Sequence, residues 1–190
     1  MRPVIRAFDA WLRRAEGVFE FTDDPACVLR LQVARAPHDL GLGDRCVRAG
    51  EPVLVLHLWN EHLPPLPAAG PDLAWARRAQ RLFVTSLRVA ADCARRDPHL
   101  ARARAVGGIT PMLSHDDRAA GARVIERLGF TVSPFHHPLG RFGEFWENFY
   151  SWWLMWAFSP ASLRSRTFRG MQRVEMWMLA EDFLRRFADG

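Results

Sequence analysis

The chain has 190 residues and a mass of 21.8 kDa, which is enough for one substantial hydrophobic core and too little for two ordinary domains. We therefore expect one domain over residues 1–190. The formal net charge is +5, and all 26 basic residues are arginine. This excess suits an anionic membrane surface or a nucleic acid, and net charge alone does not choose between them.

The cysteines predict a reducing compartment. Cys27, Cys46 and Cys93 are odd in number and far apart, so they form neither a metal-type C-x-x-C pair nor a disulfide framework. Residues 1–14 interrupt every apolar run with charge and lack the apolar core of a signal peptide. We expect a cytoplasmic protein, at the inner face of the membrane.

The N-terminal part predicts a helix followed by strands. Apolar residues at helical spacing favour an amphipathic helix over residues 3–16, ending at Gly17. Residues 18–21, 27–36 and 44–48 are then expected to form strands of an antiparallel meander.

The strand at residues 27–36 alternates two kinds of side chain. Arg30 and Gln32 share one side, while Leu29 and Leu31 share the other. This alternation predicts that one face of the strand is exposed to solvent.

Residues 52–63 predict a central strand, because the run is apolar on both faces and then ends in polar groups. Val53, Val55, His57 and Trp59 would point to one face, and Leu54, Leu56, Leu58 and Asn60 to the other. His57 would be nearly buried.

Polar residues at strand ends often line ligand sites. We therefore select His57, Asn60 and Glu61 as a candidate catalytic pocket, in which His57 would act as a general base oriented by a carboxylate. The alternative is a structural His57 hydrogen-bonded to the backbone.

A proline-rich connector at residues 63–71 leads to a long amphipathic helix over residues 72–95, ended by Asp97-Pro98. Arginines lie largely off its apolar stripe. A charged outer face is typical of soluble helices, so we predict no nucleic-acid partner.

The next segments predict a βαβ unit, with a strand at residues 105–110, a helix ending at Leu128 before Gly129, and a strand at residues 130–133. Ser114, His115 and Asp116 fit a helix cap and not a catalytic triad, because consecutive residues cannot converge on one reacting atom. Residues 174–179 and 181–187 predict a last strand and a last helix.

Residues 145–158 are dominated by aromatic side chains, in a segment too short to span a bilayer. Arginines follow it without any acidic residue before Glu175. This order is typical of an element facing anionic lipid, and the alternatives are a partner-binding surface or a core helix. The predicted membrane or partner surface comprises Trp152, Trp153, Trp156, Arg164, Arg166 and Arg169.

Neither a metal nor a cofactor is predicted. His57, His62, His136 and His137 with Glu61 lack the helical spacings of metal ligands. The run at residues 122–130 is similar to the closing helix and strand of GNAT-type acetyltransferases. The chain has no glycine-rich loop of the kind that holds coenzyme A, so this resemblance implies at most a degenerate acyltransferase.

Four short motifs give a second resemblance. They are Leu-His-Leu-Trp-Asn-Glu-His-Leu at residues 56–63, Gly-Ile-Thr at 108–110, Arg-Leu-Gly-Phe at 127–130, and the aromatic segment followed by Val-Glu-Met-Trp-Met. In this order the chain resembles the YkoP-like domain family, bacterial domains found alone or behind polysaccharide deacetylase domains.

The resemblance implies a single α+β domain, here with a mixed sheet, an N-terminal meander, a βαβ unit and covering helices. It also implies a role in envelope glycan or lipid-linked metabolism, with no chemistry to carry over. We therefore expect a peripheral protein that binds an anionic membrane surface or an envelope-biosynthesis protein. The alternatives are a non-enzymatic interaction domain and the degenerate acyltransferase.

Overall fold

A computed structural model describes residues 14–65, 67, 72–112, 122–135, 140, 143, 145, 149 and 172–189. In this part of the chain a six-stranded sheet has the order β1-β2-β5-β6-β8-β7. β6 is parallel to β5, and the other neighbouring strands are antiparallel. The predicted α+β class with a mixed sheet is confirmed. The strands are β1 (Val18–Phe19), β2 (Leu29–Arg35), β5 (Pro52–Leu58), β6 (Ala105–Met112), β7 (Thr131–Pro134) and β8 (Gln172–Leu179).

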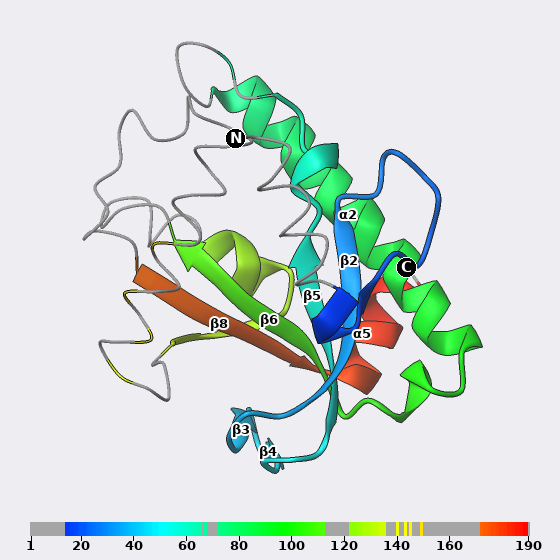
Figure 1. Cartoon of the computed structure of the whole chain (residues 1–190), viewed down its shortest axis with the longest axis vertical. Coiled ribbons are helices and arrows are strands. Elements are labelled where there is room, and N and C mark those ends of the chain that lie inside the picture. Colours follow the sequence, from blue (N-terminus) through cyan, green and yellow to red (C-terminus); the bar gives the residue numbers. More distant parts are fainter. Residues whose placement is uncertain are drawn as a thin grey trace.

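Two labelled α-helices, α2 (Leu73–Arg96) and α5 (Ala180–Phe187), lie on one side of the sheet (Figure 1). The predicted long helix is confirmed by α2. Asp72 caps this helix by accepting a 2.7 Å hydrogen bond from the backbone N–H of Trp75. Short 3-10 helices η1 (Asn60–His62) and η2 (Leu100–Arg102) follow β5 and α2. None of the helices described is long and apolar enough to cross a bilayer.

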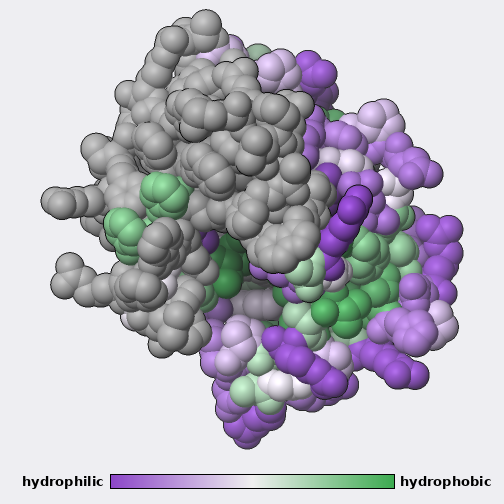
Figure 2. Space-filling view, viewed as in Figure 1, coloured by the Kyte–Doolittle hydropathy of each residue, from purple (hydrophilic) through white to green (hydrophobic). Residues whose placement is uncertain are grey.

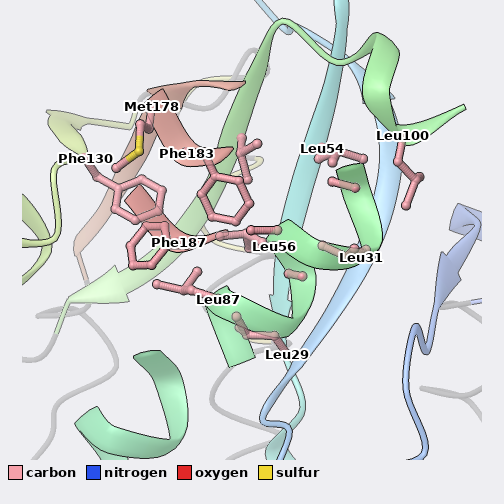
Figure 3. Close-up of a cluster of buried hydrophobic side chains, with 14 of the residues drawn as sticks. Leu29, Leu31, Leu54, Leu56, Leu87, Leu100, Phe130, Met178, Phe183 and Phe187 are labelled. Atoms are coloured by element: carbon pink, nitrogen blue, oxygen red, sulfur yellow. The ribbon is translucent and has the colours of Figure 1, made fainter. Parts of the chain in front are cut away.

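The main core fills the space between the sheet and these helices. Leu29, Leu31, Leu54 and Leu56 project from β2 and β5 toward Leu87 of α2. Figure 3 shows these leucines meeting aromatic side chains of the C-terminal helix in one cluster. Apolar burial of this kind is the main source of stability in a domain. The aromatic members of the cluster include Phe130, Phe183 and Phe187.

The central strand is confirmed over Pro52–Leu58, because β5 pairs with β2 on one side and β6 on the other, whereas residues 60–62 of the predicted run form η1. Its two faces also separate as predicted, with Leu54 and Leu56 in the main core and Val53 in a second cluster. Leu58 departs from the expectation of full cover, since it is 47% exposed at the end of the strand.

The meander prediction is wrong for residues 44–48. β3 (Leu40–Leu42) and β4 (Arg45–Val47) form a separate two-stranded hairpin. The physical reason is that β2 continues directly into its pairing with β5, since the backbone N–H of Ala36 bonds to the carbonyl of Glu51. Residues 37–50 therefore leave the sheet, and the hairpin packs over its second face against Trp177.

The βαβ prediction is confirmed with one difference. Residues 122–127 are helical, Gly129 has φ 95°, and β7 follows. The last strand, β8, lies between β6 and β7 and is antiparallel to both, so these two strands are parallel but not adjacent.

At the N-terminus, residues 14–16 are helical and Gly17 has φ 73°, as expected for the end of a helix. The rest of the helix predicted at residues 3–16 lies outside the described residues. So does the predicted cap at Ser114, His115 and Asp116.

Candidate functional site

A row of polar side chains crosses the face of the sheet opposite α2. Arg30 of β2 is the register partner of His57 in β5. Farther across, Glu175 of β8 is the partner of Ser133 in β7. Partners directly opposite each other on neighbouring strands point to the same face. We call Arg30, His57, Glu175 and Ser133 the polar row.

Ile109 of β6 joins the two halves of the polar row. It is the register partner of Glu175, and it lies two residues beyond Gly107, which pairs with Val55. His57 lies two residues beyond Val55, so the same register, continued past the last paired residues, places His57 on the β5 side of Ile109. Because neighbouring strands are about 4.8 Å apart and β6 lies between β5 and β8, His57 and Glu175 are separated by at least about 10 Å along the row.

The side chain of Arg30 is the first charged group of the row. It is 4% exposed, and its Nε and Nη2 donate to the Glu20 carboxylate at 3.1 and 3.0 Å. Its Nη1 lies 3.5 Å from Glu61, and its Cζ lies 4.3 Å from the centroid of the Trp59 ring. A buried charge requires such partners, and the guanidinium provides five donors for them.

The expected solvent-exposed face of β2 is therefore wrong at Arg30. Its cover comes from the residues just after β5, where Trp59 is 8% exposed. The Trp59 ring stacks on His62 at 3.6 Å, and Nδ1 of His62 bonds to the Cys27 carbonyl at 2.7 Å. This stack fixes η1, and with it Glu61, beside the buried guanidinium.

His57 is held in one tautomer by its neighbour Gln32. The amide nitrogen of Gln32 donates to the Glu16 carbonyl at 2.8 Å, which leaves the amide oxygen to accept from Nε2 of His57, also at 2.8 Å. Burial, followed by the nearby Arg30 charge, lowers the pKa of His57. The imidazole is therefore neutral near pH 7 and has a lone pair on Nδ1, as a general base or hydrogen-bond acceptor requires.

At the other end of the row, Glu175 is 5% exposed and accepts three hydrogen bonds. The donors are Ser133 Oγ at 3.2 Å, His38 Nε2 at 3.0 Å and Trp177 Nε1 at 3.2 Å. These bonds satisfy a carboxylate that would otherwise be costly to bury. They also tie β7, β8 and the loop before the β3–β4 hairpin to one group.

Both ring nitrogens of His38 face acceptors. Nδ1 lies 2.9 Å from the Asp39 carbonyl and Nε2 lies 3.0 Å from Glu175. A backbone carbonyl only accepts, so Nδ1 is protonated. The hydrogen bond to Asp39 and the contacts with Glu175 raise the pKa of His38, although its partial burial opposes them. The pKa of His38 is thus shifted toward the imidazolium form that pairs with Glu175, and the pKa of His57 toward the neutral form.

The sheet face is open at the middle of the row. Ile109 is 39% exposed although its strand has a neighbour on each side. A ligand that reaches Ile109 would contact an apolar side chain with His57 on one flank and Glu175 on the other. Within the described residues, no three His, Cys, Asp or Glu side chains converge as metal ligands would.

The structure places the predicted pocket residues at the edge of this site. His57 lies in the row, Glu61 lies beside Arg30, and Asn60 begins η1. The side chain of Asn60 lies outside the described part of the chain, as does the predicted surface of Trp152, Trp153, Trp156, Arg164, Arg166 and Arg169.

Sequence reasoning missed Arg30, His38, Ser133 and Glu175. One sequence signal could have identified Arg30 and Glu175. Arg30 and Glu175 are each the one charged residue inside a run of apolar strand residues, at positions 28–31 and 174–179. Such a residue on a buried strand needs a partner, and pairing of this kind marks either a structural network or a site.

Comparison with models of known families identifies the family of the chain. The family model of the YkoP domain matches residues 36–187. The matched stretch contains His38, His57, Ser133 and Glu175, whereas Arg30 precedes it. No curated protein and no solved structure matches the chain.

Proposed function

The chain belongs to the YkoP domain family, and from this membership and the polar row we propose that it is a peripheral membrane-surface protein of bacterial envelope glycan or lipid-linked metabolism. In this proposal the open sheet face binds a hydroxyl-rich ligand, a glycan or the sugar part of a lipid-linked precursor. The protein acts at the cytoplasmic face of the membrane, and its chemistry is not assigned.

The observation that supports this ligand class is the solvent-exposed Ile109 between His57 and Glu175. Sugar rings have an apolar face and a rim of hydroxyl groups, each of which both donates and accepts hydrogen bonds. The site has an apolar contact at Ile109, an acceptor at the His57 imidazole, and carboxylates at its edge in Glu20 and Glu61, whose side chains are 49% and 35% exposed. A few polar groups around an apolar patch are typical of small-molecule sites.

The membrane part of the proposal rests on the beginning of the aromatic segment. Phe145 and Phe149 are helical, four residues apart, and 49% and 43% exposed. Exposed aromatic side chains suit the interfacial region of a bilayer, and they suit a partner protein in the non-enzymatic alternative.

The ligand proposal is tested with an N-acetylglucosamine oligosaccharide as the probe, titrated into the full chain by calorimetry. We expect saturable binding that weakens about tenfold or more in His57→Asn and in Glu61→Gln, because each removes a hydrogen-bonding group from the site. Glu181→Gln is the matched control, since Glu181 pairs with Arg45 on the surface and lies outside the row.

Equal affinity in all three variants would reject the sheet face as the binding site. No binding to the oligosaccharide, together with a higher melting temperature in coenzyme A, would favour the acyltransferase alternative.

A further inference from the structure

Helix α2 has an unusual charge pattern on its exposed side. Residues 73–91 include four arginines and no acidic residue. Arg77, Arg81 and Arg88 are spaced by four and seven residues, so they lie on one face of the helix, and all three are exposed. The opposite side packs on the sheet through Ser86, Leu87 and Ala90.

Within the described part of the chain, these arginines differ from several others on the surface in having no acidic neighbour. Arg45 pairs with Glu181 at 2.6 Å, Arg48 with Asp39 at 2.8 Å, and Arg104 with Glu51 at 3.7 Å. Among the described residues, no carboxylate lies within 4 Å of Arg77, Arg81 or Arg88. In the space-filling view, hydrophilic residues run along the edge of the molecule where α2 lies (Figure 2).

An apolar residue lies at the start of the same face. Leu73, four residues before Arg77, is 66% exposed, the highest value among the large exposed apolar side chains of the described residues. These arginines and the exposed leucine match the two regions of a lipid surface. The phosphate headgroups attract the guanidinium groups, and the acyl region accepts the leucine side chain.

We propose that α2 is a membrane-docking element, whose face of Leu73, Arg77, Arg81 and Arg88 binds the phosphate headgroups of an anionic bilayer. This inference rests on the proposed membrane-surface function and names the part of the described structure that makes the contact. Duplex nucleic acid is the competing anionic partner, and the experiment separates the two.

The test is co-sedimentation of the full chain with two kinds of vesicle, one of phosphatidylcholine alone and one of phosphatidylcholine and phosphatidylglycerol in equal parts. We expect binding to the anionic vesicles only, weakened by added salt. The triple variant Arg77→Gln, Arg81→Gln, Arg88→Gln should bind about 100-fold more weakly, which corresponds to about fivefold for each arginine.

The control variant is Arg45→Gln, Arg48→Gln, Arg104→Gln, which removes the same charge from arginines that already have acidic partners. It should retain most of the affinity. Far-UV circular dichroism and melting curves establish that both variants are folded.

Equal losses in the two variants would reject α2 as the docking element while leaving the membrane function in place. No binding of the wild type to anionic vesicles would reject both. If the wild type bound duplex DNA more tightly than vesicles, and the α2 variant lost this binding, the partner of the α2 face would be nucleic acid and not the membrane. The oligosaccharide titration tests ligand binding at the sheet face independently of these outcomes.

Discussion

Arg30 and Glu61 touch each other, but they are expected to differ in their effect on stability. Arg30→Met removes the contact with Trp59 and the hydrogen bonds to Glu20, so the free energy of unfolding should fall by about 2 kcal/mol. Glu61→Gln leaves the bond from Arg30 to Glu20, and should cost less than about 1 kcal/mol because Glu61 is partly exposed.

Urea denaturation of the two variants measures the difference. A loss in Glu61→Gln as large as in Arg30→Met would mean that Glu61 is structural. The Glu61→Gln variant could then not be used to test ligand binding at the sheet face.

The two histidines of the site predict opposite responses to pH. The folded state raises the pKa of His38 above its ordinary 6.5, so its contribution to stability is complete below pH 6.5 and is lost as the pH rises through the folded pKa. The folded state lowers the pKa of His57, so its contribution is present above pH 6.5 and is lost as the pH falls through the folded pKa.

Urea midpoints of single variants, measured at pH values below and above 6.5, separate the two effects. His38→Asn should flatten the decline of stability on the alkaline side, and His57→Asn should flatten the decline on the acid side. If His38→Asn left the alkaline decline unchanged, the raised pKa of His38 beside Glu175 would be wrong.

Strand β6 requires a glycine where it meets β8. A Cβ at Gly107 would overlap the carbonyl oxygen of Met176 and lie 2.5 Å from Cε3 of Trp177. Gly107→Ala should therefore lower the free energy of unfolding by about 2 kcal/mol or more, because either β8 or the indole must move. Trp177 also donates to Glu175, so the change should disturb the polar row as well.

Gly41→Ala in β3 is the matched control, since nothing lies within 4 Å of its added Cβ. We expect a change within about 0.5 kcal/mol there. Equal urea midpoints for the two alanine variants would contradict the close approach of Trp177 to β6.

The elements that the sequence predicted well are those whose pattern is local. The α2 stripe, the alternation of β5 and the glycine after Leu128 depend on residues close in sequence. The departure of residues 37–50 from the sheet depends on pairing between β2 and β5, which no local pattern reports.

The site was predicted only in part for the same reason. His57 and Glu61 follow from the end of a strand. Arg30 lies beside them through the pairing of β2 with β5, and Glu175 joins the row through the pairing of β8 with β6. A charged residue inside an apolar strand could have been selected, but its partners, such as His38 at 137 residues from Glu175, are visible only in the fold.

At the scale of the whole molecule, the two faces of the sheet have different roles. One face is closed by α2 and α5 over an apolar core. The other has the polar row, partly covered by the β3–β4 hairpin and open at Ile109. In our account the first face stabilises the fold and the second binds the ligand, while the outer side of α2 contacts the membrane.

The central claim is that the polar row is a ligand site, and imidazole resonances of His57 and His38 report on it directly. We propose recording long-range ¹H–¹⁵N spectra of the labelled full chain while the N-acetylglucosamine oligosaccharide is added. If the polar row binds the oligosaccharide, His57 and His38 should show saturable shifts with one shared affinity, and His99, which lies after α2, should show none. Shifts at neither histidine of the row, or equal shifts at His99, would contradict it.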